Sequence, residues 1–119
     1  HCTSMGRVLL AALDDAALSH YLERATLQPH TEFTITDPTA LRDIIVQVRE
    51  QGWCLLNQEL EDGVRSVATP IHDASGRVVA AINTSTHATR VSLETLEANF
   101  LPALQECSAE IDRDLAGIR

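Results

Sequence analysis

The residues best suited to chemistry are small polar side chains that recur at every second position of two neighbouring segments. Ser66 follows Val64 in the first segment, and Ser85 follows Asn83 in the second. Alternate residues of an extended chain point to the same face, so the four side chains share one face if the segments pair. Small residues beside hydroxyl and amide groups leave space and offer hydrogen bonds. The pattern predicts a ligand pocket on this face, with a helix packed over small residues as the alternative.

A tight turn at Asp73–Gly76 joins the two segments into a hairpin, because Asp and Gly supply the backbone angles that such a turn needs. The expected opposite pairs are His72 with Arg77, Ala68 with Ala81, Ser66 with Asn83, and Val64 with Ser85. Arg65 falls on the other face, together with aliphatic residues. We expect Arg65 to form a structural salt bridge there instead of contacting a ligand.

The elements that must position this face follow from hydrophobic periodicity and capping residues. We expect helices that start at Thr3 or Ser4, at Asp14 or Asp15, and at Asp37, strands over Trp53–Gln58, Val64–His72 and Arg77–Thr86, and a long closing helix capped by Ser92. Gly52 should end the third helix, and Pro102 should bend or stagger the closing one. The expected fold class is α+β.

Composition narrows the function classes. A chain of 119 residues with 45% hydrophobic residues is about one globular domain. Its net charge of −8, from 17 acidic and 9 basic residues, repels phosphate backbones. The chain is therefore not expected to bind nucleic acid through its general charge, and it contains no apolar run long enough to span a bilayer.

Cysteine and histidine usage argues against a catalytic or metal centre. Three widely spaced cysteines fit reduced thiols of a cytoplasmic protein, and we interpret Cys54 and Cys107 as small core residues. The histidines lack metal-site spacing to cysteines or carboxylates, and no nucleophile has an adjacent base. We expect no metal, no cofactor and no enzymatic activity.

The acidic run at residues 59–62 suggests either a cation site or a solvated hairpin tip. A calcium loop needs oxygen ligands at alternating positions, and this run lacks them. The sequence favours the solvated tip.

Two segments resemble the effector-binding domain of IclR-type transcriptional regulators: HCTSMGRVLLAAL, and TDPTALRDIIVQVREQGWCLLNQELEDGVRSVATPIHDASGRVVAAINTS. The ending VSLETLEANFLPALQECSAEI is similar to the branch that controls aromatic-acid breakdown through protocatechuate and β-ketoadipate. The resemblance implies a GAF-like fold, in which a curved antiparallel sheet with flanking helices has a long C-terminal helix on one side and the ligand on the other. His1 falls inside the family pattern. Residues 1–119 are thus expected to be an N-terminally truncated effector-binding domain, with the winged-helix DNA-binding domain upstream.

The resemblance also implies where the effector binds. The family uses residues just before the Gly of the first helix, one position on the strand after the Gly–aromatic pair, and alternate positions on the next two strands. The matching effector-binding residues in this chain are Ser4, Met5, Leu56, Val64, Ser66, Asn83 and Ser85. Four of these are the residues that strand alternation places on one face. Leu56 stands where relatives carry a polar contact, and the bulk of Met5 should narrow the cavity.

The function implied is that of a sensor. A small organic acid, aromatic or dicarboxylic, would fill the pocket and modulate DNA binding through the missing N-terminal domain. The implied regulator is a cytoplasmic homodimer or homotetramer without a membrane association. The alternative is an oligomerisation module of a regulator with no functional ligand site.

Overall fold

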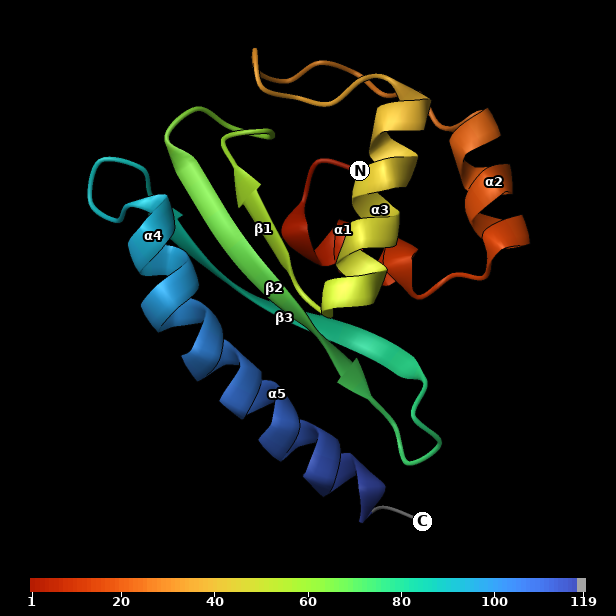
Figure 1. Ribbon diagram of the computed structural model, residues 1–119, viewed down its shortest axis with the longest axis vertical. Helices are drawn as coiled ribbons and strands as arrows, with labels where there is room; N and C mark the ends of the chain where they lie inside the picture. The colour runs from red at the N-terminus through yellow and green to blue at the C-terminus, as the bar shows by residue number, and fades with distance from the viewer. Residues whose placement is uncertain (118–119) are drawn as a thin grey trace.

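A computed structural model describes residues 1–117 of the chain and contains the helices and strands expected from the sequence (Figure 1). The elements are α1 (Ser4–Ala11), α2 (Asp15–Arg24), α3 (Pro38–Gln51), β1 (Cys54–Asn57), β2 (Val64–His72), β3 (Val78–His87), α4 (Leu93–Thr95), η1 (Leu96–Phe100) and α5 (Leu101–Ala116). Helices and an antiparallel sheet thus form the α+β fold that was predicted. Among these residues, none of the helices is long and apolar enough to cross a membrane.

The helix boundaries follow the capping signals in the sequence. The Thr3 side chain accepts a hydrogen bond from the Gly6 amide at the start of α1, and Asp14 and Asp37 cap α2 and α3 in the same way. Gly52 ends α3 with a left-handed φ of 83°, which a residue with a Cβ adopts only at a cost. The end of α3 at Gly52 thus determines where β1 begins, two residues later.

The three strands form an antiparallel sheet in the order β1-β2-β3, but the register of the hairpin differs from the expected one. Val64 lies opposite His87, Ser66 opposite Ser85, and Ala68 opposite Asn83. The expected pairing is therefore wrong by two residues. Because the side-chain period of a strand is two, this error leaves the residues from Val64 to Ile71 and their partners on their predicted faces.

Two local features produce the shift. The turn is closed by Asp73, whose amide donates to the Arg77 carbonyl at 2.9 Å. Asp73 therefore belongs to the paired part of the hairpin, and the loop is one residue shorter than expected. Gly76 then adopts a φ of 85°, as in a type I turn followed by a left-handed residue. A β-bulge between Ile71 and His72 supplies the second residue of the shift.

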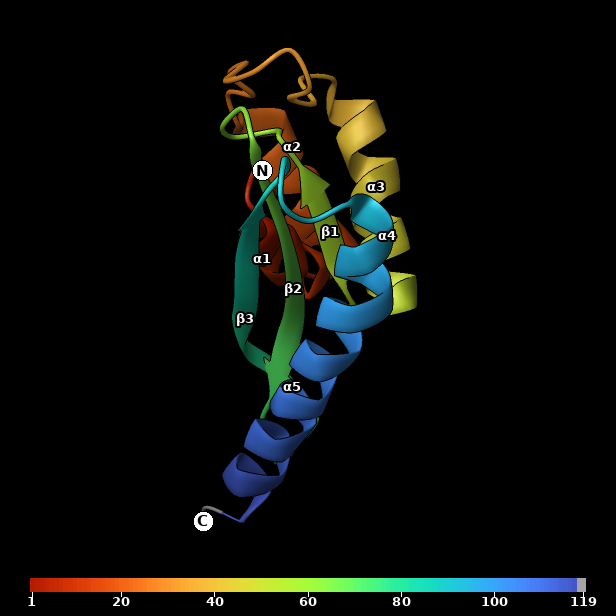
Figure 2. The ribbon, with the colours of Figure 1, turned by 90° about the vertical axis from the view of Figure 1, so that its left-hand side faces the viewer.

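The helices cover the two faces of the sheet unequally. Figure 1 shows α5 along one side of the strands and α1, α3 and α2 on the other; in Figure 2, α4 and α5 lie in front of the strands and α1 behind. Helix α1 packs across all three strands, and α3 packs on α1. The main apolar core lies on this side and contains Val8, Ala11, Leu18, Leu22, Leu41, Ile45, Val48, Cys54 and Ala68. The smaller core on the α5 side contains Val67, Leu96 and Leu101.

The closing helix is interrupted as Pro102 predicts. Proline lacks the amide that would bond four residues back, and its ring clashes with that carbonyl. The preceding turn widens into the π-helical segment η1, in which the Leu101 amide bonds the Leu96 carbonyl. Further along α5, Ser108 shares a buried hydrogen bond with Thr69, and Asp112 accepts hydrogen bonds from the amide and the ring of His72. Polar contacts therefore attach α5 to the far end of β2.

The three cysteines are free thiols, as the spacing predicted. Cys54 is buried in the main core, but Cys107 is exposed. The interpretation of Cys107 as a core residue is wrong, because Leu104 and Ser108 are the α5 residues that face the sheet. The apolar positions of the helix cover a wider arc than the part that contacts the sheet, and Cys107 lies outside that part.

Candidate functional site

A cavity of about 140 Å³ lies where the N-terminus of α1 approaches the sheet and the β1–β2 loop. All seven residues expected to bind an effector line it: Ser4, Met5, Leu56, Val64, Ser66, Asn83 and Ser85. They come from α1 and from all three strands. The structure thus brings the expected residues together around one cavity.

The first turn of α1 forms one wall of this cavity. The Gly6 amide donates a hydrogen bond to the Thr3 side chain, and the Arg7 amide donates one to the Thr3 carbonyl at 3.1 Å. The first two amides of the helix, those of Ser4 and Met5, have no intrahelical acceptor. The positive end of the helix dipole adds to these donors, so this wall favours a negative charge.

The sheet wall carries the hydroxyl groups. Ser66 Oγ donates a 2.9 Å hydrogen bond to Ser4 Oγ, and both side chains are buried. Because Ser66 gives its proton to Ser4, the Ser4 hydroxyl proton is free to point at a ligand. On β3, Asn83 lies within a long 3.4 Å contact of Ser85 Oγ, which leaves both side chains available for other partners. Leu56 is buried and makes the floor of the cavity apolar.

Four further residues line the cavity that the sequence did not assign to it: Cys2, Thr3, Leu60 and Glu61. Cys2 and Thr3 are the two residues before Ser4, so their closeness in sequence to an expected binding residue could have indicated that they line the cavity. Leu60 and Glu61 lie on the β1–β2 loop, and nothing in their local sequence indicates where that loop folds. Glu61 is the one charged side chain in this lining.

The acidic run is not simply a solvated tip. Glu59 accepts two hydrogen bonds from the guanidinium of Arg7, and the Glu59 side chain is only 12% exposed. Arg7 is itself 1% exposed and donates a third hydrogen bond, from Nε to the His1 carbonyl at 2.8 Å. The expectation of a solvated tip is therefore wrong for Glu59, because a buried arginine requires a charged partner. Within residues 1–117, no cluster of His, Cys, Asp and Glu is arranged to hold a metal ion.

The Arg7–Glu59 pair lies beside the thiol of Cys54. Burial raises the pKa of Cys54 to about 11, while the nearby Arg7 guanidinium opposes that rise and the Glu59 carboxylate adds to it. The thiol is therefore protonated at neutral pH and leaves Glu59 as the anionic partner of Arg7.

Arg65 lies on the opposite face of the sheet, as alternation predicted, but its partners are not carboxylates. Its guanidinium donates to the Asn57 side chain at 2.8 Å and to the carbonyls of Ala88 and Val91 at 3.3 and 2.9 Å. The expected salt bridge is wrong, because the segment between β3 and α4 places the Ala88 and Val91 carbonyls, not a carboxylate, next to the guanidinium. Arg65 has a structural role, as expected.

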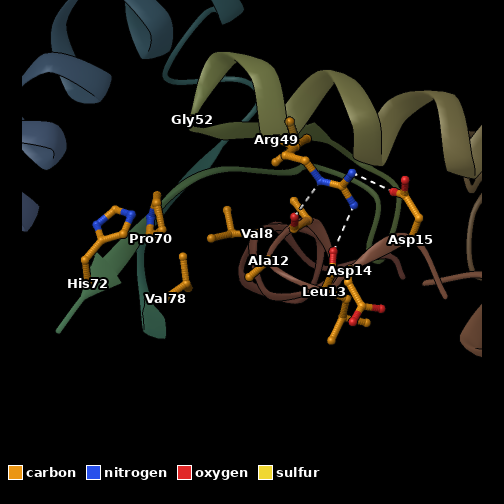
Figure 3. A pocket seen from close by; sticks show the side chains of 12 residues that line it. Val8, Ala12, Leu13, Asp14, Asp15, Arg49, Gly52, Pro70, His72 and Val78 are labelled. Carbon is orange, nitrogen blue, oxygen red and sulfur yellow. Dashed lines mark hydrogen bonds and ion pairs between the residues drawn. The ribbon is translucent and has the colours of Figure 1, made fainter. Parts of the chain in front are cut away.

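A second and larger cavity, of about 650 Å³, lies at the other end of α1 between α3 and the β2–β3 hairpin (Figure 3). Arg49 lies at one end of it, and its three guanidinium nitrogens donate to the Ala11 and Leu13 carbonyls and to Asp15, each at 2.9 Å. His72, at the opposite end in Figure 3, is bonded to Asp112. In the larger cavity, Arg49 and His72 thus form hydrogen bonds within the protein. In the smaller cavity, the Ser4 and Met5 amides have no intrahelical acceptor.

The family model described as bacterial transcriptional regulator IclR C-terminal matches residues 1–113. The chain belongs to the IclR family of bacterial transcriptional regulators. This IclR-type chain is 54% identical over 117 residues to the Pca regulon regulatory protein of Pseudomonas putida. The matched region covers 98% of this chain and 40% of that protein. The relatives that it matches are named as regulators, not as enzymes.

Solved structures support the same assignment. A putative transcriptional regulator from Rhodococcus sp. RHA1 superposes with a TM-score of 0.97 at 50% identity, over 99% of this chain and 48% of that one. The inducer-binding domain of a PobR double mutant from Acinetobacter, in complex with 3-hydroxybenzoic acid, gives 0.91 at 34% identity, over 94% of this chain and 64% of that one. The IclR-type chain therefore has the fold of an effector-binding domain and resembles regulators of aromatic-acid pathways. It spans less than half the length of the Pseudomonas relative.

Proposed function

We propose that this chain is the effector-sensing part of an IclR-type regulator and that a small organic acid binds in the cavity at the N-terminus of α1. The observation that carries the proposal is the convergence of all seven expected residues on one cavity. The PobR relative, whose inducer-binding domain was solved with 3-hydroxybenzoic acid, supports an aromatic acid as the effector.

The volume of the cavity is close to that needed by one aromatic ring, and we place the carboxylate of the effector at the N-terminus of α1. A cavity of about 150 Å³ holds benzene in an engineered protein core, and this one has about 140 Å³. The carboxylate would lie against the free amides of Ser4 and Met5, where the helix dipole favours negative charge. The ring would lie on Leu56, the Ser4 hydroxyl and the Asn83 and Ser85 side chains would donate to the remaining oxygens, and Ser66, whose proton is used by Ser4, would accept from a ring hydroxyl.

Effector binding would act on DNA affinity by shifting the domain between two arrangements, as an effector with different affinities for two states must do. Strand β2 connects the two sides of the sheet, since Ser66 lines the cavity and Thr69 holds α5. We propose that DNA is contacted by a winged-helix domain outside this chain and that the regulator is a homodimer or homotetramer, because two half-sites require two copies. Light scattering of the intact regulator measures that state.

The test is calorimetric titration of the intact regulator with 3-hydroxybenzoate, 4-hydroxybenzoate, protocatechuate and β-ketoadipate. We expect Ser66→Val and Asn83→Ala to weaken binding of the acid that binds best by about two- to tenfold each, because a lost hydrogen bond costs about 0.5–1.5 kcal/mol. Thr84→Val is the matched control, since Thr84 adjoins Asn83 on β3 but lies on the other face. Its affinity should equal that of the wild type.

Two outcomes would reject the proposal. If the variants bind as tightly as the wild type, the acid occupies another site, and the larger cavity beside Arg49 is the next candidate. If none of the four acids binds at millimolar concentration, the alternative of an oligomerisation module without a functional ligand site gains support.

A further inference from the structure

The cavity has one wall without regular secondary structure. Residues 58–63 connect β1 to β2, and Leu60 and Glu61 from this loop line the cavity opposite the first turn of α1. The loop starts at Gln58, whose φ is 58°, and ends at Gly63, whose φ is 83°. Its position is therefore set by the contacts that hold it, not by a repeating backbone ladder.

The base of the loop is held mainly by hydrogen bonds to the backbone. The Thr31 hydroxyl donates to the Gln58 carbonyl at 2.6 Å, and the Thr34 hydroxyl donates to the Glu59 carbonyl. The Gly63 amide donates to the Gln58 side chain at 2.9 Å. These contacts hold the base of the loop to the 31–34 segment and to itself, but none reaches α1.

The link to α1 is the Arg7–Glu59 ion pair. Arg7 lies three residues after Ser4 on α1, and Glu59 directly precedes Leu60 on the loop. Two guanidinium nitrogens bond the two carboxylate oxygens, and the third donor bonds the His1 carbonyl. Such a two-pronged contact fixes orientation as well as distance.

We propose that Arg7 and Glu59 are positioning residues for the effector: their ion pair fixes the loop wall of the cavity relative to the α1 wall before the effector arrives. This inference rests on the proposed function for the part that concerns affinity. A wall that is already ordered spares the effector the entropy of ordering it, which is how preorganisation increases affinity. Neither residue lines the cavity, so both act through Ser4, Met5, Leu60 and Glu61.

The test compares the ligand-free and ligand-bound intact regulator. Removing one partner would leave a buried charge unpaired and endanger folding, so the variant is the double replacement Arg7→Met with Glu59→Leu, which keeps apolar volume. Arg49→Met is the matched control, because Arg49 also clamps two elements through three hydrogen bonds but lies at the other cavity.

The first measurement is hydrogen–deuterium exchange without ligand. We expect the amides of Gly63 and Val64, which donate to the Gln58 side chain and the Glu61 carbonyl, to exchange at least about tenfold faster in the double variant, since an opening that becomes about 1.4 kcal/mol easier gives that factor. Arg49→Met should leave the exchange of both amides unchanged. Unchanged exchange of both amides in the folded double variant would overturn the inference, whatever ligand the protein binds.

The second measurement is titration with 3-hydroxybenzoate. The double variant should bind it about tenfold more weakly, and Arg49→Met should bind it as the wild type does. Faster exchange with unchanged affinity would mean that the ion pair orders the loop but does not position the effector, and would overturn the proposal. Faster exchange in a regulator whose wild type does not bind 3-hydroxybenzoate would support the loop clamp and count against the proposed function with this acid.

Discussion

On the α1 face of the sheet, nine buried side chains form the main apolar core, whereas three form the core on the α5 face. The larger core is built mostly between helices α1, α2 and α3, and it leaves a cavity where the first turn of α1 meets the strands. The α5 face has few apolar contacts and adds polar ones, at Thr69–Ser108 and His72–Asp112. The α1 face, where we propose that the effector binds, thus has less packing next to the sheet, and the α5 face depends on each of the contacts to its single helix.

The largest expected effect tests how strongly the α5 face depends on Leu96, whose side chain is fully buried. Leu96→Ala should lower the free energy of unfolding by about 3 kcal/mol, because it removes buried methylene groups and leaves a cavity. Leu93→Ala is the matched control, since Leu93 lies in the preceding turn and is 37% exposed. Urea denaturation of the intact regulator measures both. A similar loss for the two variants would show that the small core on the α5 face is not the contact that matters.

The next effect separates the two faces by function. Arg65→Ala should lower the free energy of unfolding by about 2 kcal/mol, because hydrogen bonds from a charged group contribute about 1.5–3 kcal/mol and the carbonyls lose their donor. Arg90→Ala, at an exposed position nearby, should change stability by less than about 0.5 kcal/mol. Effector affinity should be unchanged in both, since neither residue lines the cavity. Loss of binding in a folded Arg65→Ala protein would mean that the ligand occupies the α5 face.

Local signals in the sequence predicted the helix ends and the faces of the strands. Thr3, Asp37 and Gly52 act through neighbours within a few residues, so their effects can be inferred without knowledge of the fold. The face of Ser66 and Asn83 was also predicted although the register was wrong, because a two-residue error preserves alternation. The Asp73 turn and the bulge at His72 each shift the register by one residue, and a single one of them would have inverted the face.

Long-range partners could not be predicted in the same way. Arg7 and Glu59 are separated by 52 residues, and the sequence between them contains no feature that indicates their pairing. The partners of Arg65 are backbone carbonyls, which every residue carries and which composition cannot reveal. The loop residues Leu60 and Glu61 line the cavity next to the Arg7–Glu59 contact, and the sequence could not place them either.

The smallest expected effect compares one thiol from each side of the sheet. Cys54 is buried under α1, and burial raises the pKa of its thiol from 9.0 to about 11. A pKa that is higher in the folded state contributes stability that is complete below pH 9 and is lost as the pH rises through 11. At pH 10 the folded protein should therefore be less stable than at pH 8 by about 1 kcal/mol from this group alone.

The measurement is the free energy of unfolding of the intact regulator between pH 8 and pH 10, for wild type and Cys54→Ala. The variant loses packing at both pH values, but its alkaline decrease should be smaller than that of the wild type by the Cys54 contribution. Cys107→Ala is the control, because Cys107 is exposed on α5 and its replacement should leave the alkaline decrease unchanged. A thiol reagent at pH 8 should in turn modify Cys107 rapidly and Cys54 only on unfolding, since a buried and protonated thiol is a poor nucleophile. Equal modification of the two cysteines in the folded protein would show that the α1 face opens to solvent, and the distinction between a ligand-holding face and a helix-holding face would then fail.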